Sequence, residues 1–188
     1  MAKVYDFDNT VYDGDSSIDF FLFSLKNHKS LIRFFPLQSI GFILMKLKLI
    51  NKEKGKSAFF SFVKGLKDVD REVLEFWKQS FSKIKPWYIA QKSNTDIIIS
   101  ASPDFLLNPL KNLLDINLII ASPCNKSSGI FYGKNCYGKE KVSRFKTECP
   151  EINIEAFYSD SVSDKPMKDI SGQSFLVYGD KIVPWNSD

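Results

Sequence analysis

The stretch Val4-Tyr5-Asp6-Phe7-Asp8-Asn9-Thr10 joins a short apolar strand to two carboxylates and a threonine. Because side chains alternate along a strand, Asp6 and Asp8 are expected to point the same way, into a site beyond the carboxyl end of that strand. Two carboxylates this close stay ionised together only when a cation or a strong donor lies between them; otherwise the pKa of one rises and that residue becomes an acid. The stretch therefore predicts chemistry at the end of a strand, through a metal ion or through proton transfer.

A second acidic pair lies far downstream, in Tyr158-Ser159-Asp160-Ser161-Val162-Ser163-Asp164. It also follows an apolar, strand-like run directly. Carboxylate oxygens are ligands that Mg²⁺ prefers in proteins. Taken together, the two acidic segments predict an oxygen-ligand site for Mg²⁺.

Composition narrows the class of protein. The chain has 188 residues, of which 44% are hydrophobic and 26% charged, and this predicts a globular protein with one buried core and a modest insertion. The three cysteines, Cys124, Cys136 and Cys149, have no metal-ligand spacing and are expected to be reduced thiols. The chain starts in a strand with no signal-peptide pattern ahead of it, so a cytoplasmic location is expected.

Charge patterning predicts the kind of partner. The net charge of +4 is spread over many separated lysines rather than gathered in one run, which disfavours nucleic-acid binding. A mildly basic surface favours small anionic substrates. The sequence assigns no oligomeric state.

The order of predicted elements indicates the fold class. Residues 16–85 show only helical patterns, whereas strands and helices alternate from residue 86 onward. Strands are predicted at 96–100, 118–121, 152–158 and 174–178, helices at 104–114 and 139–149, and a β-hairpin at 130–137 that turns at Gly133-Lys134. We therefore expect an α/β fold: a doubly wound parallel sheet of Rossmann type in residues 1–15 and 86–188, with an all-helical cap inserted at 16–85.

The longest apolar run extends from Leu31 to Ile50, and charged or helix-breaking residues interrupt it, so no transmembrane helix is predicted. The many phenylalanines of the helical segment are expected to form a core between helices. They include Phe20, Phe21, Phe23, Phe34, Phe35, Phe42, Phe59, Phe60 and Phe62. The less favoured alternative is that residues 34–45 form an apolar pocket or a membrane-touching surface for an amphiphilic phosphoester.

Four motifs in order resemble those of the haloacid dehalogenase-like hydrolases, in the phosphoserine-phosphatase-like branch that carries a helical cap. The segments are Asp6 to Val11, Ile97 to Ser100, Gly138 to Val142, and Asp160 to Asp164, and the resemblance covers essentially the whole chain. It implies a phosphoric monoester hydrolase that is Mg²⁺-dependent and acts on a small or amphiphilic phosphate monoester through an aspartyl-phosphate. Phosphotransfer to an acceptor other than water, and a catalytically silent phosphate-binding module, are the alternatives.

The resemblance also implies a role for each matching residue. Asp6 would be the nucleophile and Asp8 the proton shuttle. Mg²⁺ would be held by Asp6, by the main-chain carbonyl of Asp8 and by Asp160, with Asp164 either bound to the metal through water or orienting the lysine. The phosphate-binding residues would be Asn9, Thr10, Ser100, Ala101 and Lys141. Lys141 is preferred to Lys139 because an apolar residue, Phe145, stands four positions after it.

Several positions keep two interpretations. Asn9, Ser159 and Ser161 depart from the residues common in phosphoserine phosphatases, which weakens the case for phosphoserine as the substrate. Asp15 is either a helix N-cap or a residue that contacts a substrate amino group. Ser102 is expected to cap a helix or to play a secondary part in the site, because it would share the direction of Ser100 only if the strand continued by two residues. Arg33 and Arg71 are expected on solvated helix faces, with a clamp for an anionic group as the alternative; the only histidine, His28, is expected at the surface.

Overall fold

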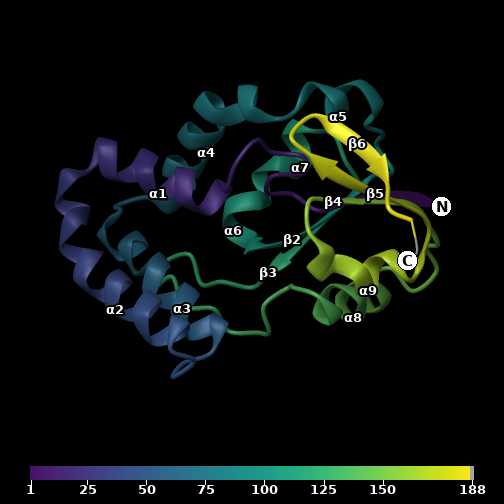
Figure 1. Cartoon of the computed structure of the whole chain (residues 1–188). Helices are drawn as coiled ribbons and strands as arrows, with labels where there is room; N and C mark the ends of the chain where they lie inside the picture. The colour runs from purple at the N-terminus through teal and green to yellow at the C-terminus, as the bar shows by residue number, and fades with distance from the viewer. Residues whose placement is uncertain (187–188) are drawn as a thin grey trace.

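A computed structural model describes residues 1–186, so the last two residues of the predicted core, 187 and 188, lie outside it. Within this range the strands form one sheet in the order β3-β2-β1-β4-β5-β6. Their bounds are β1 Ala2–Tyr5, β2 Ile97–Pro103, β3 Leu118–Ser122, β4 Ile154–Ser159, β5 Ser171–Tyr178 and β6 Lys181–Pro184. Strands β1 to β5 pair with one another in parallel, and β6 pairs with β5 in the antiparallel direction. The predicted doubly wound α/β fold is confirmed (Figure 1).

The order of strands explains where a site can form. The chain places β2 and then β3 on one side of β1 and later returns to place β4 on the other side. The strand order therefore reverses at β1, and in open parallel sheets ligands bind beyond the carboxyl ends of the strands at such a point. The central strands are apolar on both faces, with Val4, Tyr5 and residues 97–99 fully buried.

Residues 16–83 contain helices and turns alone. Their bounds are α1 Ser16–Asn27, η1 Lys29–Phe34, α2 Phe35–Lys46, α3 Lys52–Phe59, η2 Phe60–Gly65, α4 Val69–Ser80 and η3 Phe81–Lys83, where η marks a 3₁₀-helix. Asp15, Asn51 and Asp68 cap α1, α3 and α4 by accepting hydrogen bonds from main-chain N–H groups of the first turn. Figure 1 shows α1, α2 and α3 grouped at one side of the molecule, away from β5, β6 and both termini.

The helical segment leaves and rejoins the sheet at one place. The main-chain N–H of Asp13 donates to the carbonyl of Lys83 at 2.8 Å, and that of Lys85 donates to the carbonyl of Val11 at 2.8 Å. Between these bonds, Tyr12 and Ile84 form an isolated bridge. The two ends of the segment are therefore fixed against each other just after the first acidic motif.

The other helices flank the sheet. They are α5 Pro86–Gln91, α6 Asp104–Leu107, α7 Pro109–Leu113, α8 Lys139–Glu148, η4 Val162–Asp164 and α9 Lys165–Lys168. The single helix predicted at 104–114 is wrong, because Pro109 has no N–H to donate and begins a new helix after Asn108.

The predicted hairpin at 130–137 is also wrong. Residues 130–132 instead run beside 123–125: the N–H of Asn125 donates to the carbonyl of Ile130 at 2.9 Å, and the N–H of Tyr132 donates to that of Pro123 at 3.2 Å. The turn lies at 125–129, where the side-chain oxygen of Asn125 accepts from Ser127 and Ser128. The hairpin lies later in the chain, in β5 and β6, and residues 181–184, where no strand was expected, form β6.

The aromatic core was predicted only in part. Phe20, Phe21, Phe60 and Phe62 are buried, whereas Phe35 and Phe42 have exposed fractions of 56% and 59%. Both exposed rings lie on α2, whose inward positions Gln38 and Gly41 are small or polar, so the rings are left outside. Within residues 1–186 no helix has both the length and the apolar character needed to cross a membrane.

Candidate active site

A cavity of about 170 Å³ lies at the carboxyl ends of β1, β2 and β4. It brings together every predicted site residue except Thr10. The lining residues are Asp6, Asp8, Asn9, Ser100, Ala101, Tyr137, Lys141, Asp160, Ser161, Ser163 and Asp164. Residues from both acidic segments, from the end of β2 and from α8 therefore share one small polar space.

Lys141 connects the two acidic segments. Its Nζ lies 2.7 Å from Oδ1 of Asp6 and 2.7 Å from Oδ2 of Asp164, and its side chain is 3% exposed. Burial by itself would lower the pKa of Lys141, but the two carboxylates outweigh burial and raise that pKa, so the ammonium stays charged. Lys139 is exposed, and it is Lys141 that reaches Asp6.

Asp164 is held against this lysine. Its Oδ2 accepts hydrogen bonds from Lys141 and, at 2.9 Å, from the hydroxyl of Ser159. The sequence left two roles open for Asp164, and the geometry supports the one in which it orients the lysine.

Asp6 and Asp160 form the pair that suits a cation. Burial raises the pKa of both carboxyl groups, and the nearby Asp160 raises that of Asp6 further while Lys141 lowers it. Among residues 1–186 no group of three or more His, Cys, Asp or Glu side chains is placed to hold a metal ion. The two carboxylates are nevertheless oxygen donors, which fit Mg²⁺ with waters in its shell.

The carboxylate of Asp8 is held by a different set of donors from that of Asp6. Its Oδ1 accepts from the main-chain N–H of Ser16 at 2.7 Å, and its Oδ2 accepts from the hydroxyl of Ser102 at 2.6 Å. Burial, reinforced by the charge of Asp15, raises the pKa of Asp8 to about 6 although these donors lower it. A carboxyl group with this pKa can give and take a proton near neutral pH.

The interpretation of Ser102 as a helix cap is wrong. Strand β2 runs to Pro103, so the strand does continue past Ser100 and brings both serines to the site. The Oγ of Ser100 lines the cavity and accepts from the main-chain N–H of Ser102 at 3.0 Å. The period of two between the serines was the available signal, and it was missed because the strand was expected to end at residue 100.

Thr10 and Asn9 shape the loop after β1. Thr10 is buried, and its hydroxyl accepts a hydrogen bond from the main-chain N–H of Asp160 at 2.9 Å, so it joins the two acidic segments from outside the cavity. Asn9 has φ = 58°, a left-handed conformation that asparagine tolerates better than most residues. Its carbonyl accepts from Nζ of the buried Lys85 at 2.5 Å, and no sequence pattern had pointed to that lysine.

A second cavity of about 440 Å³ shares Asp8 and Ala101 with the first. Most of its lining is apolar. The other lining residues are Asp15, Ser17, Ile18, Gln38, Phe42, Met45, Gly55, Lys56, Phe59, Phe60 and Ser102. It therefore extends from the Asp8 carboxylate to the helices α1, α2 and α3.

Lys56, in α3, is the charged group of the second cavity that the sequence did not reveal. Its Nζ donates to the carbonyl of Ala101 at 2.6 Å and to Oδ1 of Asn135 at 2.7 Å. Burial lowers the pKa of Lys56 to about 8, with Asp8 and Asp15 acting in the opposite direction. A lone lysine in a helix carries no sequence signal for such a place, because most lysines are solvated.

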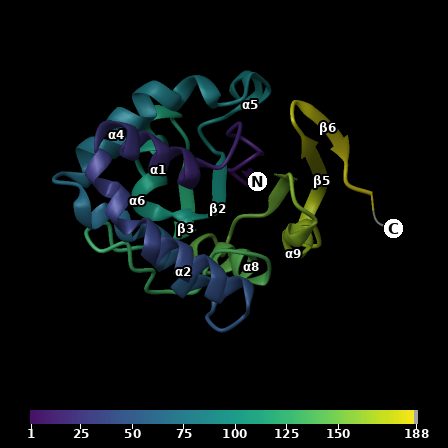
Figure 2. The same cartoon turned by 60° about the vertical axis from the view of Figure 1, so that its left-hand side comes forward.

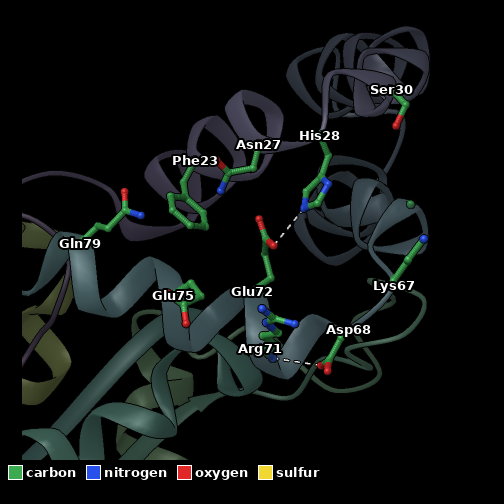
Figure 3. A pocket seen from close by; sticks show the side chains of 11 residues that line it. Phe23, Asn27, His28, Ser30, Lys67, Asp68, Arg71, Glu72, Glu75 and Gln79 are labelled. Carbon is green, nitrogen blue, oxygen red and sulfur yellow. Dashed lines mark hydrogen bonds and ion pairs between the residues drawn. The ribbon is translucent and has the colours of Figure 1, made fainter.

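The remaining candidates lie elsewhere or serve structure. Asp15 caps α1 by accepting from Ser17 at 2.9 Å and Ile18 at 3.1 Å, although it also lines the second cavity. His28 contacts Glu72 at 3.0 Å and lines a separate cavity of about 650 Å³ with Arg71, which contains none of the assigned site residues (Figure 3). The three cysteines are free and buried.

Comparison with known proteins gives the evolutionary context. A profile of the haloacid dehalogenase-like hydrolases matches residues 4–168. A search of curated proteins finds no significant match.

Solved structures share the fold. A protein of unknown function from Bordetella pertussis Tohama I superposes with a TM-score of 0.74 at 15% identity, over 92% of this chain and 87% of that chain. A probable phosphoserine phosphatase from Vibrio cholerae gives 0.62 at 13% identity, over 93% and 55%. A phosphoserine phosphohydrolase-like protein from Francisella tularensis gives 0.56 at 16% identity, over 93% and 86%. At such identities the likeness shows a shared fold.

Proposed function

The chain belongs to the haloacid dehalogenase-like hydrolases, and from this premise we propose that it is a Mg²⁺-dependent phosphatase of small or amphiphilic phosphate monoesters. The observation that carries the proposal is the placement of Lys141 between Asp6 and Asp164, in a cavity that Asp8 and Asp160 also line. A phosphate ester resists attack because its oxygens are negatively charged, so a site for it must combine a nucleophile with fixed positive charge.

Asp6 is proposed as the nucleophile. One of its carboxylate oxygens attacks phosphorus, a bond forms between that oxygen and phosphorus, and the bond from phosphorus to the ester oxygen breaks. Lys141 holds Asp6 in place and neutralises charge on the phosphate. Water then attacks the aspartyl-phosphate and releases phosphate, which restores the carboxylate.

Asp8 is proposed as the group that moves the protons. In its protonated form it gives a proton to the leaving alkoxide, and as a carboxylate it then takes a proton from the attacking water. Ser102 and the N–H of Ser16 hold its two oxygens, and the pKa of about 6 lets both forms be populated near neutral pH.

Asp6, Asp160 and the main-chain carbonyl of Asp8 would hold the Mg²⁺ ion. When bound there, the ion would supply neutralisation of charge on the phosphate oxygens. Asp164 would act through Lys141, whose ammonium it contacts. Ser100 is proposed to donate its hydroxyl to the phosphate, together with main-chain N–H groups near Ala101.

Residues 16–85 are proposed to form the cap over a core made of 1–15 and 86–188. In support of this division, α3 reaches the core at three points: Lys56 to Ala101, Glu53 to the N–H of Asn135 at 3.0 Å, and Lys52 over the ring of Tyr137 at 3.7 Å. A cytoplasmic location is proposed as well, since free thiols persist in reducing compartments.

The test is hydrolysis of a panel of phosphate monoesters with Mg²⁺ and with a chelator. The panel contains phosphoserine, phosphocholine, sugar phosphates, a lipid phosphate and p-nitrophenyl phosphate. We expect turnover that chelation abolishes and that Asp6→Asn lowers by about a thousandfold or more. Asp115→Asn is the matched control, because Asp115 is exposed and asparagine suits its φ of 49°.

Mass spectrometry of the rapidly quenched protein should find the phosphoryl group on the peptide that contains Asp6. Turnover that survives Asp6→Asn would overturn the mechanism. Phosphoryl transfer to an added alcohol at the expense of free phosphate would instead identify a phosphotransferase, and tight binding of ester without turnover would identify a binding module.

A further inference from the structure

Helix α2 has its polar side inward and its apolar side outward. Its buried positions are Gln38 and Gly41, whereas Leu37, Ile40, Phe42 and Ile43 have exposed fractions from 48% to 59%. An ordinary surface helix of a globular protein has the opposite arrangement, with its apolar stripe against the core. The arrangement therefore requires an explanation other than packing of this chain.

The contact between α2 and α3 explains how the helix is held without its large apolar side chains. Gly41 lies so close to Ala58 that a Cβ added to the glycine would be 2.3 Å from the Cβ of Ala58. Gly55 makes a similar approach to Met45, and Nε2 of Gln38 donates to the carbonyl of Phe59 at 2.8 Å. Small residues and one buried amide make this contact, so the outward apolar side chains contribute little to it.

The exposed apolar side chains are concentrated in one short part of the chain. We call this surface the α2 face, and its residues are Ile32, Phe35, Leu37, Ile40, Phe42, Ile43, Leu47 and Leu49, all more than a third exposed. In Figures 1 and 2 α2 lies at the periphery of the molecule, away from β5 and β6. Scattered exposed apolar residues are normal, but a concentration of this kind marks an interaction surface.

Charge around the α2 face points to one kind of occupant. The segment 20–52 contains no Asp or Glu, and its six cations are all exposed: Lys26, Lys29, Arg33, Lys46, Lys48 and Lys52. The segment therefore has a net charge of +6, whereas the rest of the chain, with 20 cations and 22 acidic residues, sums to −2. Apolar side chains with a surround of Lys and Arg match an anionic lipid surface, where the chains enter the interface and the cations contact headgroups.

We propose that the α2 face docks on an anionic membrane surface and that the substrate is a lipid phosphate monoester presented there. A second copy of the chain fits the same face less well, because a symmetric contact would bring the positive charge of this segment against itself. An anionic lipid surface supplies both an apolar phase for the exposed side chains of this face and negative charge for the cations around it.

The second cavity connects the α2 face to the chemistry, and this part of the inference rests on the proposed phosphatase function. Phe42 belongs to the α2 face and, with Met45, lines the cavity that has Asp8 and Ala101 at its other end. A lipid phosphate at the first cavity could therefore extend its apolar part between α1, α2 and α3 toward the membrane. Lys56 would lie beside its polar part.

The first experiment measures binding to vesicles. It compares phosphatidylcholine alone with phosphatidylcholine and phosphatidylglycerol in equal parts, by co-sedimentation at low and high salt. We expect binding to the anionic vesicles only, weaker at high salt, and about tenfold or more weaker in Ile40→Glu and Ile43→Glu. Leu113→Glu is the matched control, since Leu113 on α7 is 50% exposed and lies outside the α2 face. Thermal unfolding midpoints establish that all variants are folded.

Asp6→Asn separates docking from catalysis, because it should bind the vesicles as wild type does while failing to hydrolyse any ester. For activity, we expect the ratio of hydrolysis of vesicle-borne phosphatidic acid to that of soluble p-nitrophenyl phosphate to fall in Ile40→Glu. Vesicle binding without hydrolysis of any ester by wild type would support docking and refute the proposed function. Hydrolysis of soluble esters without vesicle binding would do the reverse.

Three results would overturn the docking proposal. One is the absence of binding to anionic vesicles, and another is binding that Ile40→Glu and Ile43→Glu leave intact. The third is a dimer, measured by light scattering, that Ile40→Glu dissociates, because the face would then belong to a second copy of the chain.

Discussion

The ammonium nitrogen of Lys141 lies 2.7 Å from Oδ1 of Asp6, although 135 residues separate them in the chain. Asp6 follows β1, and Lys141 stands in the first turn of α8. Gly138 sets the start of that helix with φ = 56° and ψ = −124°, a conformation that only glycine adopts readily. This glycine therefore sets where α8 begins, and Lys141 in its first turn reaches Asp6.

Lys141→Ala should lower both stability and activity. Without the lysine, Asp6 and Asp164 remain buried with no countercharge, and breaking such a buried pair costs about 3–5 kcal/mol. We expect kcat to fall by about a hundredfold or more, because the positive charge that Lys141 places beside the phosphate is lost as well. Urea unfolding and steady-state kinetics measure the two effects. Lys139→Ala removes an exposed lysine of the same helix turn and should alter neither; equal effects would contradict the assignment.

Asp8→Asn should make the protein more stable and inactive. The pKa of Asp8 is raised from its ordinary value of 3.8 to about 6, so the folded protein binds the proton more tightly than the unfolded chain. Between these pH values stability therefore falls as pH rises. Asparagine abolishes that loss, a gain of at most about 3 kcal/mol above pH 6 that vanishes below about pH 4. Urea unfolding of the metal-free protein from about pH 4 to 8 measures the gain. A gain that is independent of pH would contradict the raised pKa.

Ser102→Ala should change the pH dependence of turnover. The Ser102 hydroxyl donates to Asp8 at 2.6 Å and lowers its pKa, so its loss should raise that pKa and move the corresponding limb of the pH profile to higher pH. We expect kcat to fall by about tenfold because the carboxyl group also loses its orientation. Ser17→Ala is the control: the Ser17 hydroxyl contacts that of Ser102 at 3.2 Å and has no contact with Asp8. An unshifted profile in Ser102→Ala would argue against Asp8 as the titrating group.

Lys56→Met should remove a pH dependence of substrate binding. Burial lowers the pKa of Lys56 to about 8, so the wild-type side chain loses its charge as pH rises through that value. We expect the wild-type KM for an anionic ester to rise above pH 8, and the variant to show a KM about fivefold higher at neutral pH and flat above it. Initial-rate kinetics from neutral pH upward measure this. Lys54→Met, an exposed position on the same helix, should keep the wild-type profile.

Local patterns were sufficient for the parts of the fold that repeat them. The apolar runs at 96–100 and 152–158 predicted β2 and β4, and the acidic residues that follow β1 and β4 predicted a shared site at the sheet edge. The hairpin at 130–137 failed because its partner is the segment 123–125 rather than its own second half. Turn residues such as Gly133-Lys134 show where a chain can bend, and the choice of hydrogen-bond partner depends on segments elsewhere in the fold.

Exposure was the property that patterns predicted least well. Phe20 and Phe42 carry the same side chain in similar apolar runs, yet one is fully buried and the other is 59% exposed. The difference arises because α1 packs on η2 and α4 through its rings, whereas α2 packs on α3 through Gly41 and Gln38. Which side of a helix faces its neighbour depends on that neighbour's shape as well as on the helix's own sequence.

The sequence by itself determined the family, the strand–helix alternation and the placement of Asp6, Asp8 and Asp160 at strand ends, because these follow from local periodicity and from the order of motifs along the chain. Only the tertiary structure decided that Lys141 bridges Asp6 and Asp164, that Ser102 orients Asp8 and that Lys56 enters the site. It also decided that α2 turns its apolar side outward. These relationships join residues far apart in the chain, and the distances that make them are set by packing of the whole fold.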